Sequence, residues 1–236
     1  AYEISLGLVG SEMCIRDRPY AKYNLTKLLE NVGKKQSQNE YVKITDLRSL
    51  IYRGLGITCE NDEYINIAKN IYNDYLNEEI EVEPNLAASS IAIMANNGDK
   101  VLHKEFFNKY TNSQIPQEKI RFLYSLSEFK SSDLAEETLK MALSKKIKNQ
   151  DAPYLIATTL RNYRHSLIAW NFIEDNWKKI NEIFPNNTIP RMFGGIKSIS
   201  DEGLAKRVSS FFEKNPIPQG QKTIDQNIEK MKINLK

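Results

Sequence analysis

The stretch TLRNYRHSLIAWNFIEDNW, residues 159–177, indicates the fold class of this chain more clearly than any other segment. Five of its side chains recur at steps of three and four, which places them on one face of an α-helix. These residues are Leu167, Trp170, Ile173, Asn176 and Trp177. Because both tryptophans of the chain lie on this face, we predict a helix that buries a broad apolar surface, preceded by a turn at Arg161-Asn162.

Outward from this segment, the chain has the pattern of helices joined by short polar turns. A first helix begins around Leu25 and ends near Gly33, since glycine suits the position after a helix C-terminus. Thr45 or Asp46 is expected to cap a second helix, which the segment 54–56 stops. Further helices are predicted over 61–75, 86–95, 101–110, 117–129 and 133–143, and from residue 152 onward.

The predicted helices repeat at a regular spacing. Leu126 and Leu139 match Leu160 and Ile173 at a spacing of 34 residues, and Met94 matches Leu126 at a spacing of 32. Spacings of this size are typical of helical-repeat solenoids. Because each antiparallel helix pair buries its apolar residues only by stacking on its neighbours, we predict an all-α, HEAT- or armadillo-like α-solenoid with a concave face. The small glycine-containing turn of tetratricopeptide repeats is missing.

The amino-acid composition narrows the expected partners and the expected location of the protein. The chain has 236 residues, 33 Lys and Arg against 30 Asp and Glu, and a net charge of +3, so we expect neither nucleic acid nor membrane as a partner. No linker-like stretch divides the chain, and no apolar run is long enough to span a bilayer. Two cysteines, Cys14 and Cys59, do not make a disulfide framework, and a cytoplasmic location is therefore expected.

The amino terminus differs in composition from the rest of the chain. Residues 1–18, AYEISLGLVGSEMCIRDR, contain Gly7 and Gly10, which are expected to break a helix. The part SLGLVGSEMCIRDR resembles a translated sequencing adapter, and its charges contradict the basic-then-apolar order of a signal peptide. We therefore predict a non-native or disordered leader over 1–18 and one domain over 19–236, with the true protein extending upstream of Pro19.

Several segments together resemble one known family. The Trp-containing segment is similar to a run of Arg-Asn, a turn and Leu-Ala-Trp-x-Phe-x-x-x-Asn-Trp. Similar segments follow the order of the family, at Pro84-Asn85-Leu86, Lys109-Tyr110, Glu118-Lys119, Arg121, Lys148, Gln150-Asp151, Phe211-Phe212, Gln226, Ile228-Glu229 and Asn234. From about Asp46 onward the chain resembles the C-terminal, HEAT-like helical domain of the gluzincin zinc aminopeptidases, which include aminopeptidase N, puromycin-sensitive enzymes, endoplasmic-reticulum aminopeptidases and tricorn interacting factors. Leu160 stands where a glycine often precedes the arginine.

The resemblance implies a non-catalytic role for this chain. The family binds zinc through H-E-x-x-H, and this chain has only His103 and His165, neither followed by that pattern. Zinc is therefore expected in a missing catalytic domain and no cofactor or metal in this fragment, which should be inactive alone. The expected partners are peptide substrates and the missing N-terminal and catalytic domains. The domain would cap the active-site cavity and help hold peptides whose N-terminal residues are removed.

Four basic residues are candidates for binding a peptide C-terminal carboxylate, because cations facing the cavity pair with carboxylates. Arg161 comes first, since it matches the family's Arg-Asn turn, followed by Lys148, Arg164 and Arg191. A structural interpretation also fits: Arg161 could pair with a helix C-terminus or with Asp151.

Other features have structural interpretations too. His103 is expected on a polar helix flank and His165 in a turn beside Arg164. Trp170 and Trp177, seven residues apart, are interpreted as packing between helices. The acidic run Asp74, Glu78, Glu79, Glu81 and Glu83 is interpreted as a solvated turn, and Cys59 has no basic neighbour that would make it a nucleophile. An alternative function remains: a stand-alone helical scaffold that binds a protein partner on its concave face.

Overall fold

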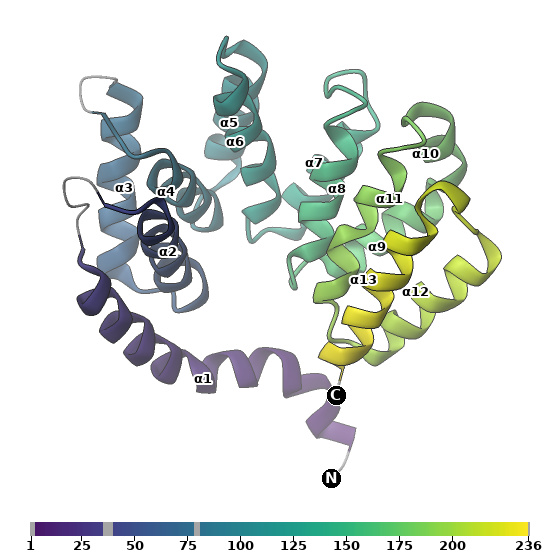
Figure 1. The fold of residues 1–236 in the computed structure, drawn as a ribbon, viewed down its shortest axis with the longest axis horizontal. Coiled ribbons are helices and arrows are strands. Elements are labelled where there is room, and N and C mark those ends of the chain that lie inside the picture. The colour runs from purple at the N-terminus through teal and green to yellow at the C-terminus, as the bar shows by residue number, and fades with distance from the viewer. Residues whose placement is uncertain (1–2, 35–39, 78–80, 236) are drawn as a thin grey trace. The chain divides into compact units, whose positions relative to one another are not determined.

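The computed structural model describes residues 3–34, 40–77 and 81–235, and it describes side chains from residue 17 onward. Within these ranges all regular structure is helical, with thirteen α-helices and no strand (Figure 1). The all-α prediction is confirmed. The chain divides into two compact units, residues 1–97 and 98–236, and each is described by itself.

The first unit contains four α-helices and one π-helical turn. They are α1 (Glu3–Val32), α2 (Val42–Arg53), η1 (Gly54–Thr58), α3 (Asp62–Asn77) and α4 (Pro84–Asn96). The predicted end of the first helix is confirmed, because Gly33 has a φ of 87° and its N–H donates to the carbonyl of Leu29 at 2.8 Å. Helix α4 begins at Pro84, where the Glu83 carboxylate accepts from the N–H groups of Asn85 and Leu86.

Two predicted boundaries in this unit are wrong. Helix α2 begins at Val42 and not at Thr45, since the extended backbone of Tyr41 precedes it and Thr45 Oγ1 donates to the Val42 carbonyl at 2.7 Å. The glycines at 54–56 do not stop the helix, because the chain continues through η1. A Cβ on Gly56 would lie 2.8 Å from the Ile93 side chain, so the glycine allows η1 to approach α4 closely.

The amino-terminal segment also differs from the prediction. One helix runs through Gly7 and Gly10, which were expected to interrupt it, and Pro19 lies inside the same helix. A glycine within a helix costs about 1 kcal/mol relative to alanine, which disfavours the helix without forbidding it. That residues 1–18 are a non-native leader stays a prediction.

Helices α1 to α4 share one apolar core in the first unit. Helix α4 packs against both α2 and α3, and α1 packs on α2 and η1. The fully or nearly buried members are Leu29, Ile51, Tyr52, Leu55, Cys59 and Tyr64, with Leu25 and Leu86 packed against them. Burial raises the pKa of the Cys59 thiol, which keeps this cysteine in its unreactive protonated form.

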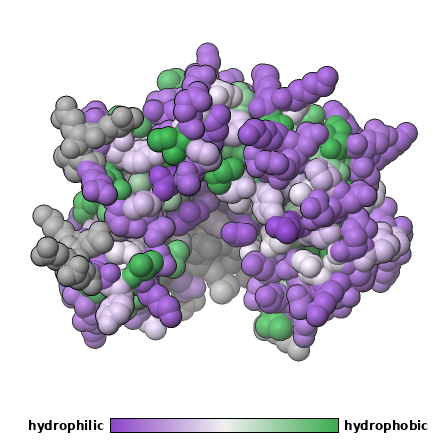
Figure 2. Space-filling view, turned by 45° about the horizontal axis from the view of Figure 1, so that its top comes forward, coloured by the Kyte–Doolittle hydropathy of each residue, from purple (hydrophilic) through white to green (hydrophobic). Residues whose placement is uncertain are grey.

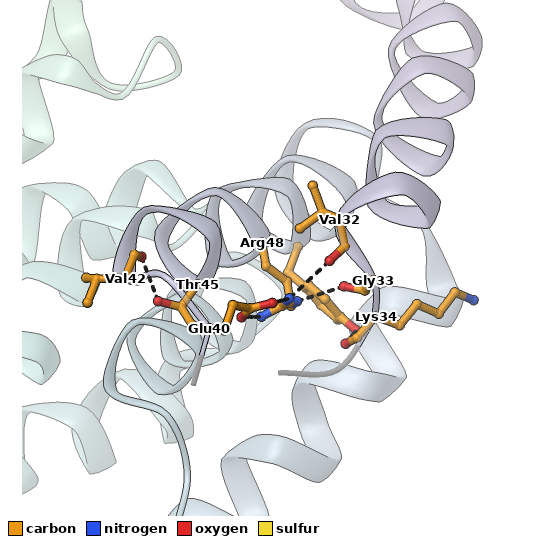
Figure 3. Close-up of polar contacts among 8 residues, drawn as sticks. Val32, Gly33, Lys34, Glu40, Val42, Thr45 and Arg48 are labelled. Carbon is orange, nitrogen blue, oxygen red and sulfur yellow. Dashed lines mark hydrogen bonds and ion pairs between the residues drawn. The ribbon is translucent and has the colours of Figure 1, made fainter. Parts of the chain in front are cut away.

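A buried ion pair fixes the end of α1 to α2 (Figure 3). The Arg48 guanidinium, 3% exposed, donates to the two carboxylate oxygens of Glu40 at 2.7 and 2.6 Å. Its Nε donates to the carbonyl of Gly33 at 2.7 Å and its Nη2 to that of Val32 at 3.2 Å. Arg48 therefore satisfies carbonyls that the last turn of α1 leaves without helical partners.

The second unit contains the remaining nine α-helices of the described chain and three short 3₁₀ turns. They are α5 (Lys100–Asn112), α6 (Pro116–Ser125), η2 (Leu126–Glu128), α7 (Ser132–Ala142), α8 (Ala152–Arg161), α9 (Ser166–Asp175), α10 (Trp177–Ile183), α11 (Ile189–Met192), η3 (Phe193–Ser198), α12 (Glu202–Lys214), η4 (Pro218–Gly220) and α13 (Gln221–Asn234). Helix α5 packs on α6, while α8 contacts α7, α9, α11 and η3. Elements that precede and that follow α8 in the chain therefore pack against this helix.

The helix predicted from the Trp-containing segment is broken in two. Asn176, with φ −112° and ψ 13°, leaves helical geometry and separates α9 from α10. Leu167 was predicted on the buried face but is 51% exposed. The packing interpretation of the tryptophans is nevertheless supported, because Trp170 and Trp177 contact the same two rings, Phe193 and Phe211.

These rings form an aromatic cluster, defined here as Trp170, Trp177, Phe193, Phe211 and Phe212. Trp170 is fully buried, and its ring centroid lies 5.2 Å from that of Phe211, with the planes at 81°. Phe193 and Phe212 meet edge to face at 4.7 Å. Edge-to-face pairs of this kind add stability beyond the buried area. The cluster joins α9, α10, η3 and α12.

Both histidines are buried structural residues, which corrects the prediction that His103 lies on a polar helix flank. His103 is 2% exposed, and its Nε2 lies 2.8 Å from Thr138 Oγ1. His165 does lie in the turn before α9, but it is 1% exposed and its Nε2 lies 2.7 Å from the Phe129 carbonyl. Burial lowers the pKa of both imidazoles, so the neutral forms are favoured.

Candidate functional site

The four predicted carboxylate-binding residues lie at two ends of α8. Lys148 precedes this helix in the loop after α7, and Arg191 on α11 reaches Tyr154 in its first turn. Arg161 is the last residue of α8, and Arg164 follows in the next turn. Tyr154 and Arg161 are seven positions apart on α8, or about 10 Å along the helix axis. The structure therefore does not gather the four residues into one site.

Arg161 and Arg164 form the pair at the C-terminal end of α8. Arg161 is exposed, in the last turn, where a cation is favoured by the helix dipole. Arg164 lies over the ring of Tyr163 at 4.6 Å. Pairing of Arg161 with Asp151 is not observed, because Asp151 precedes the opposite end of α8, about 15 Å away along the axis. The interpretation of Arg161 as a partner of a helix C-terminus fits this position.

The N-terminal end of α8 carries a cluster of phenols and charges. Arg191 Nη1 donates to the Tyr154 hydroxyl at 2.6 Å, and the Tyr154 ring lies 6.5 Å from that of Tyr124. Burial, helped by the negative charge of Asp151, raises the pKa of Tyr124 to about 12. Tyr124 therefore stays protonated at neutral pH, and its hydroxyl can both donate and accept hydrogen bonds.

A pocket of about 510 Å³ opens beside this cluster. It is lined by Tyr110, Thr111, Gln114, Pro116, Lys119, Ile120, Lys146, Lys148, Gln150 and Asp151. The Tyr110 side chain is 5% exposed, and its hydroxyl accepts from the Lys148 backbone N–H at 3.4 Å. Burial raises the pKa of Tyr110 and of the Asp151 carboxyl, and Lys148 opposes the shift of Asp151. These residues all belong to the second unit.

The chemistry available at this end of α8 is binding. Lysine, arginine and protonated tyrosine donate hydrogen bonds to anions, and charge-assisted bonds of this kind are the stronger ones. Among the residues that the structure describes, no three His, Cys, Asp or Glu side chains are grouped as metal ligands. The residues present therefore do not fit a zinc ion. Sequence reasoning missed Tyr154, which follows Asp151 by three residues, and Tyr124, which only the packing of α6 near α8 brings beside it.

A second pocket, of about 320 Å³, lies in the first unit. Its polar lining groups already have partners. Arg48 binds Glu40, and the Tyr52 hydroxyl donates to the Lys34 carbonyl at 3.1 Å. Glu83 caps α4. Of the acidic run in which Glu83 lies, Glu78 and Glu79 fall outside the described residues.

The visible surface carries no large apolar patch. Figure 2 shows a mostly hydrophilic face on which hydrophobic residues form small separate groups. Within 3–34, 40–77 and 81–235, no helix is both long and apolar enough to cross a membrane. Binding through charged and hydroxyl groups is therefore the chemistry best represented on this face.

Comparisons with known proteins agree with the resemblance seen in the sequence. The family model described as ERAP1-like C-terminal domain matches residues 12–233. Human glutamyl aminopeptidase is 26% identical over 244 aligned residues, which cover 99% of this chain and 25% of that protein.

Two plant proteins are also similar. Aminopeptidase M1 of Arabidopsis thaliana is 28% identical over 151 residues, covering 62% of this chain and 17% of the plant protein. Aminopeptidase M1-B of Oryza sativa subsp. japonica is 25% identical over 197 residues, covering 80% of this chain and 22% of that protein. The chain thus spans a quarter or less of these relatives.

Proposed function

Because this chain belongs to the family of ERAP1-like C-terminal domains, we propose that it is the non-catalytic C-terminal domain of a zinc-dependent aminopeptidase. In this role the domain covers the active-site cavity of the parent enzyme. It also positions peptides whose N-terminal residues the catalytic domain removes. The observation that carries the proposal is the family match over residues 12–233.

The similarity to named aminopeptidases supports the proposal. Each of the three relatives described above is called an aminopeptidase, and the aligned segment is a minor part of each. The zinc ion and the groups that activate water belong, in this proposal, to a catalytic domain outside this chain. We further place the parent enzyme in the cytoplasm, with peptides and the other domains of its own chain as partners.

Arg191 and Tyr154 are the residues we favour for holding a peptide carboxylate. Arg191 already donates to the Tyr154 hydroxyl, so its guanidinium is held in one orientation with further N–H donors available. Lys148 lies near the same end of α8 and adds positive charge. Arg161 and Arg164 remain candidates at the other end of α8.

Peptide binding by the purified chain tests this proposal. We expect a fluorescent peptide with a free C-terminal carboxylate to bind more tightly than its C-terminal amide, and Arg191→Gln to remove this difference. Arg161→Gln is the matched variant at the opposite end of α8, and we expect it to keep the difference. If the unchanged chain binds the peptide acid and the peptide amide equally well, it does not bind the C-terminal carboxylate. If Arg161→Gln alone abolishes the preference for the acid, the carboxylate binds at the C-terminal end of α8 instead.

A further inference from the structure

We propose that the pocket beside Tyr110 is a binding site for a small oxyanion, either a carboxylate or a phosphate group. The site lies between α6 and the loop that joins α7 to α8. It is distinct from the Arg191–Tyr154 contact, and it rests only on residues of the second unit. It therefore does not depend on whether the chain acts in peptide cleavage.

Three lysines from two segments give this pocket its charge. Lys119 comes from α6, while Lys146 and Lys148 come from the loop that follows α7. Against them stands one acidic lining residue, Asp151. None of the three ammonium groups forms an ion pair with an acidic side chain in the part of the chain that the structure describes. The pocket therefore has an excess of positive charge that its own residues do not neutralise.

The Tyr110 hydroxyl supplies a directed donor in the same pocket. This residue is 95% buried and lines the pocket, so packing holds its ring in place beside the cavity. The oxygen accepts from the Lys148 N–H, and no acceptor for the hydroxyl proton is found among the described residues. An oxyanion in the pocket would accept this hydroxyl proton.

The combination selects for anions over other ligands. Three lysines repel a metal cation, and an apolar ligand offers no acceptor to the ammonium groups or to the hydroxyl. Carboxylate and phosphate oxygens accept from both ammonium and hydroxyl groups. The volume of about 510 Å³ admits an acidic side chain or chain terminus of a peptide as well as a free inorganic ion.

Titration of the purified chain with inorganic phosphate at low ionic strength tests the proposal. Binding is measured by amide shifts in two-dimensional NMR, with sodium chloride of matched ionic strength as the reference. We expect saturable shifts confined to residues around Tyr110 and Lys148. Lys148→Gln should weaken binding about tenfold and Tyr110→Phe about fivefold, as expected for losing a charged and a neutral hydrogen bond.

A matched variant separates a specific site from general attraction. Lys222→Gln removes the same charge from an exposed position on α13 that does not line the pocket, and we expect binding to be unchanged. The proposal is overturned if phosphate and acidic peptides both fail to saturate the pocket residues, or if Lys222→Gln weakens binding as much as Lys148→Gln. Circular dichroism of each variant establishes that it is folded.

A second titration distinguishes a peptide carboxylate from a free phosphate ion as the ligand. A short peptide that contains glutamate, amidated at its C-terminus, is compared with the same peptide containing glutamine. Binding of the glutamate peptide at the pocket supports the proposal with a peptide carboxylate as ligand, whereas binding of phosphate alone supports it with a free ion. Loss of carboxylate preference in Arg191→Gln has no bearing on this result, so the two proposals can fail separately.

Discussion

A polar contact beside the apolar core of the first unit contrasts with an aromatic contact in the core of the second unit. In the first unit, Arg48 of α2 donates two hydrogen bonds to carbonyls at the end of α1 and two to the Glu40 carboxylate, which lies just before α2. In the second unit, the aromatic cluster joins α9 to α12 through ring packing, with Trp170 fully buried. The Arg48 contacts span at most 16 residues of sequence, whereas the aromatic cluster joins residues 170 to 212, and the two arrangements depend on different physical terms.

This difference determines which changes each unit tolerates. Ring packing is non-directional, so its stability follows the volume and area that are buried. The stability that the ion pair contributes depends on the presence of both charged groups, because a buried charge left without its partner costs more free energy than the pair contributed. The aromatic cluster should therefore respond mainly to size and the ion pair mainly to charge balance.

The largest effect is expected from Trp170→Ala. Removing the indole leaves a cavity between Phe193, Phe211 and Phe212, and we expect a loss of about 4 kcal/mol in the free energy of unfolding. Urea unfolding followed by circular dichroism measures it. Leu167→Ala, at an exposed position on the same helix, should cost about 0.5 kcal/mol or less. Equal losses in the two variants would mean that ring packing does not hold this unit.

Glu40→Ala is expected to have the next largest effect, a loss of about 3 kcal/mol, because it leaves the Arg48 charge buried without its carboxylate. The double variant Glu40→Leu, Arg48→Met should lose less than Glu40→Ala alone, since no charge is then left unpaired. Both tryptophans belong to the second unit, so their fluorescence reports that unit while circular dichroism reports the whole chain. A double variant less stable than the single variant would contradict this account of the ion pair.

A smaller effect is expected from pH, and it should be confined to the second unit. Burial lowers the pKa of His103 and of His165, with Glu137 opposing the shift at His103 and Lys100 adding to it. As the pH falls, the two imidazoles therefore bind protons in the unfolded chain before they do so in the folded chain. This contribution to stability is complete above pH about 6.5 and is lost as the pH falls through the folded-state pKa values of the two histidines.

Urea unfolding at pH 7.5 and pH 5.5, followed by tryptophan fluorescence, measures this loss. The variant His103→Gln, His165→Gln should flatten the pH dependence in that interval, whatever its overall stability. An unchanged slope in the double variant would assign the proton uptake to other groups.

The smallest effect is expected from Lys140→Gln. Its ion pair with Glu136, at 3.2 Å, lies exposed on α7 one helical turn away. Such pairs contribute about 0.4 kcal/mol and are screened by salt. Thermal unfolding at low and high salt should show a small difference that vanishes in the variant. A loss as large as that of Glu40→Ala would remove the distinction between exposed and buried pairs.

Local signals in the sequence predicted much of the fold. Gly33 ends a helix, and Pro84 begins one, because the required backbone geometry is set by the residue itself. Asp99 caps α5 by accepting from the N–H groups of Val101 and Leu102, at the turn where a new helix was predicted. These features depend on neighbours within a few positions and need no knowledge of packing.

Features that depend on distant partners were predicted poorly. His103 is buried because Thr138, 35 residues away, offers a hydrogen bond that no local pattern reveals. In the predicted repeat, Leu126 and Leu160 are both fully buried, yet Tyr163, the counterpart of Phe129, is 54% exposed. Periodicity thus located the helices better than it located the buried side of each.

The candidate site shows the same division between local and distant information. Basic residues around α8 were found from the sequence, but their spacing could not show that Lys148 and Arg161 lie at opposite ends of one helix. Tyr110 was noticed only as part of a family-like segment. Its position under the Lys148 backbone depends on the fold of the loop between α7 and α8.

Gly195 in η3 limits the mutational routes by which this domain can change. A methyl group there would lie 2.5 Å from the carbonyl oxygen of Ala157 and 2.8 Å from the Cβ of Leu160, so backbone would have to move before any side chain could be accepted. A descendant sequence can therefore lose this glycine only after α8 has first shifted by other substitutions. The order of mutations therefore matters where η3 contacts α8. On the exposed faces of the same helices, substitutions can accumulate in any order.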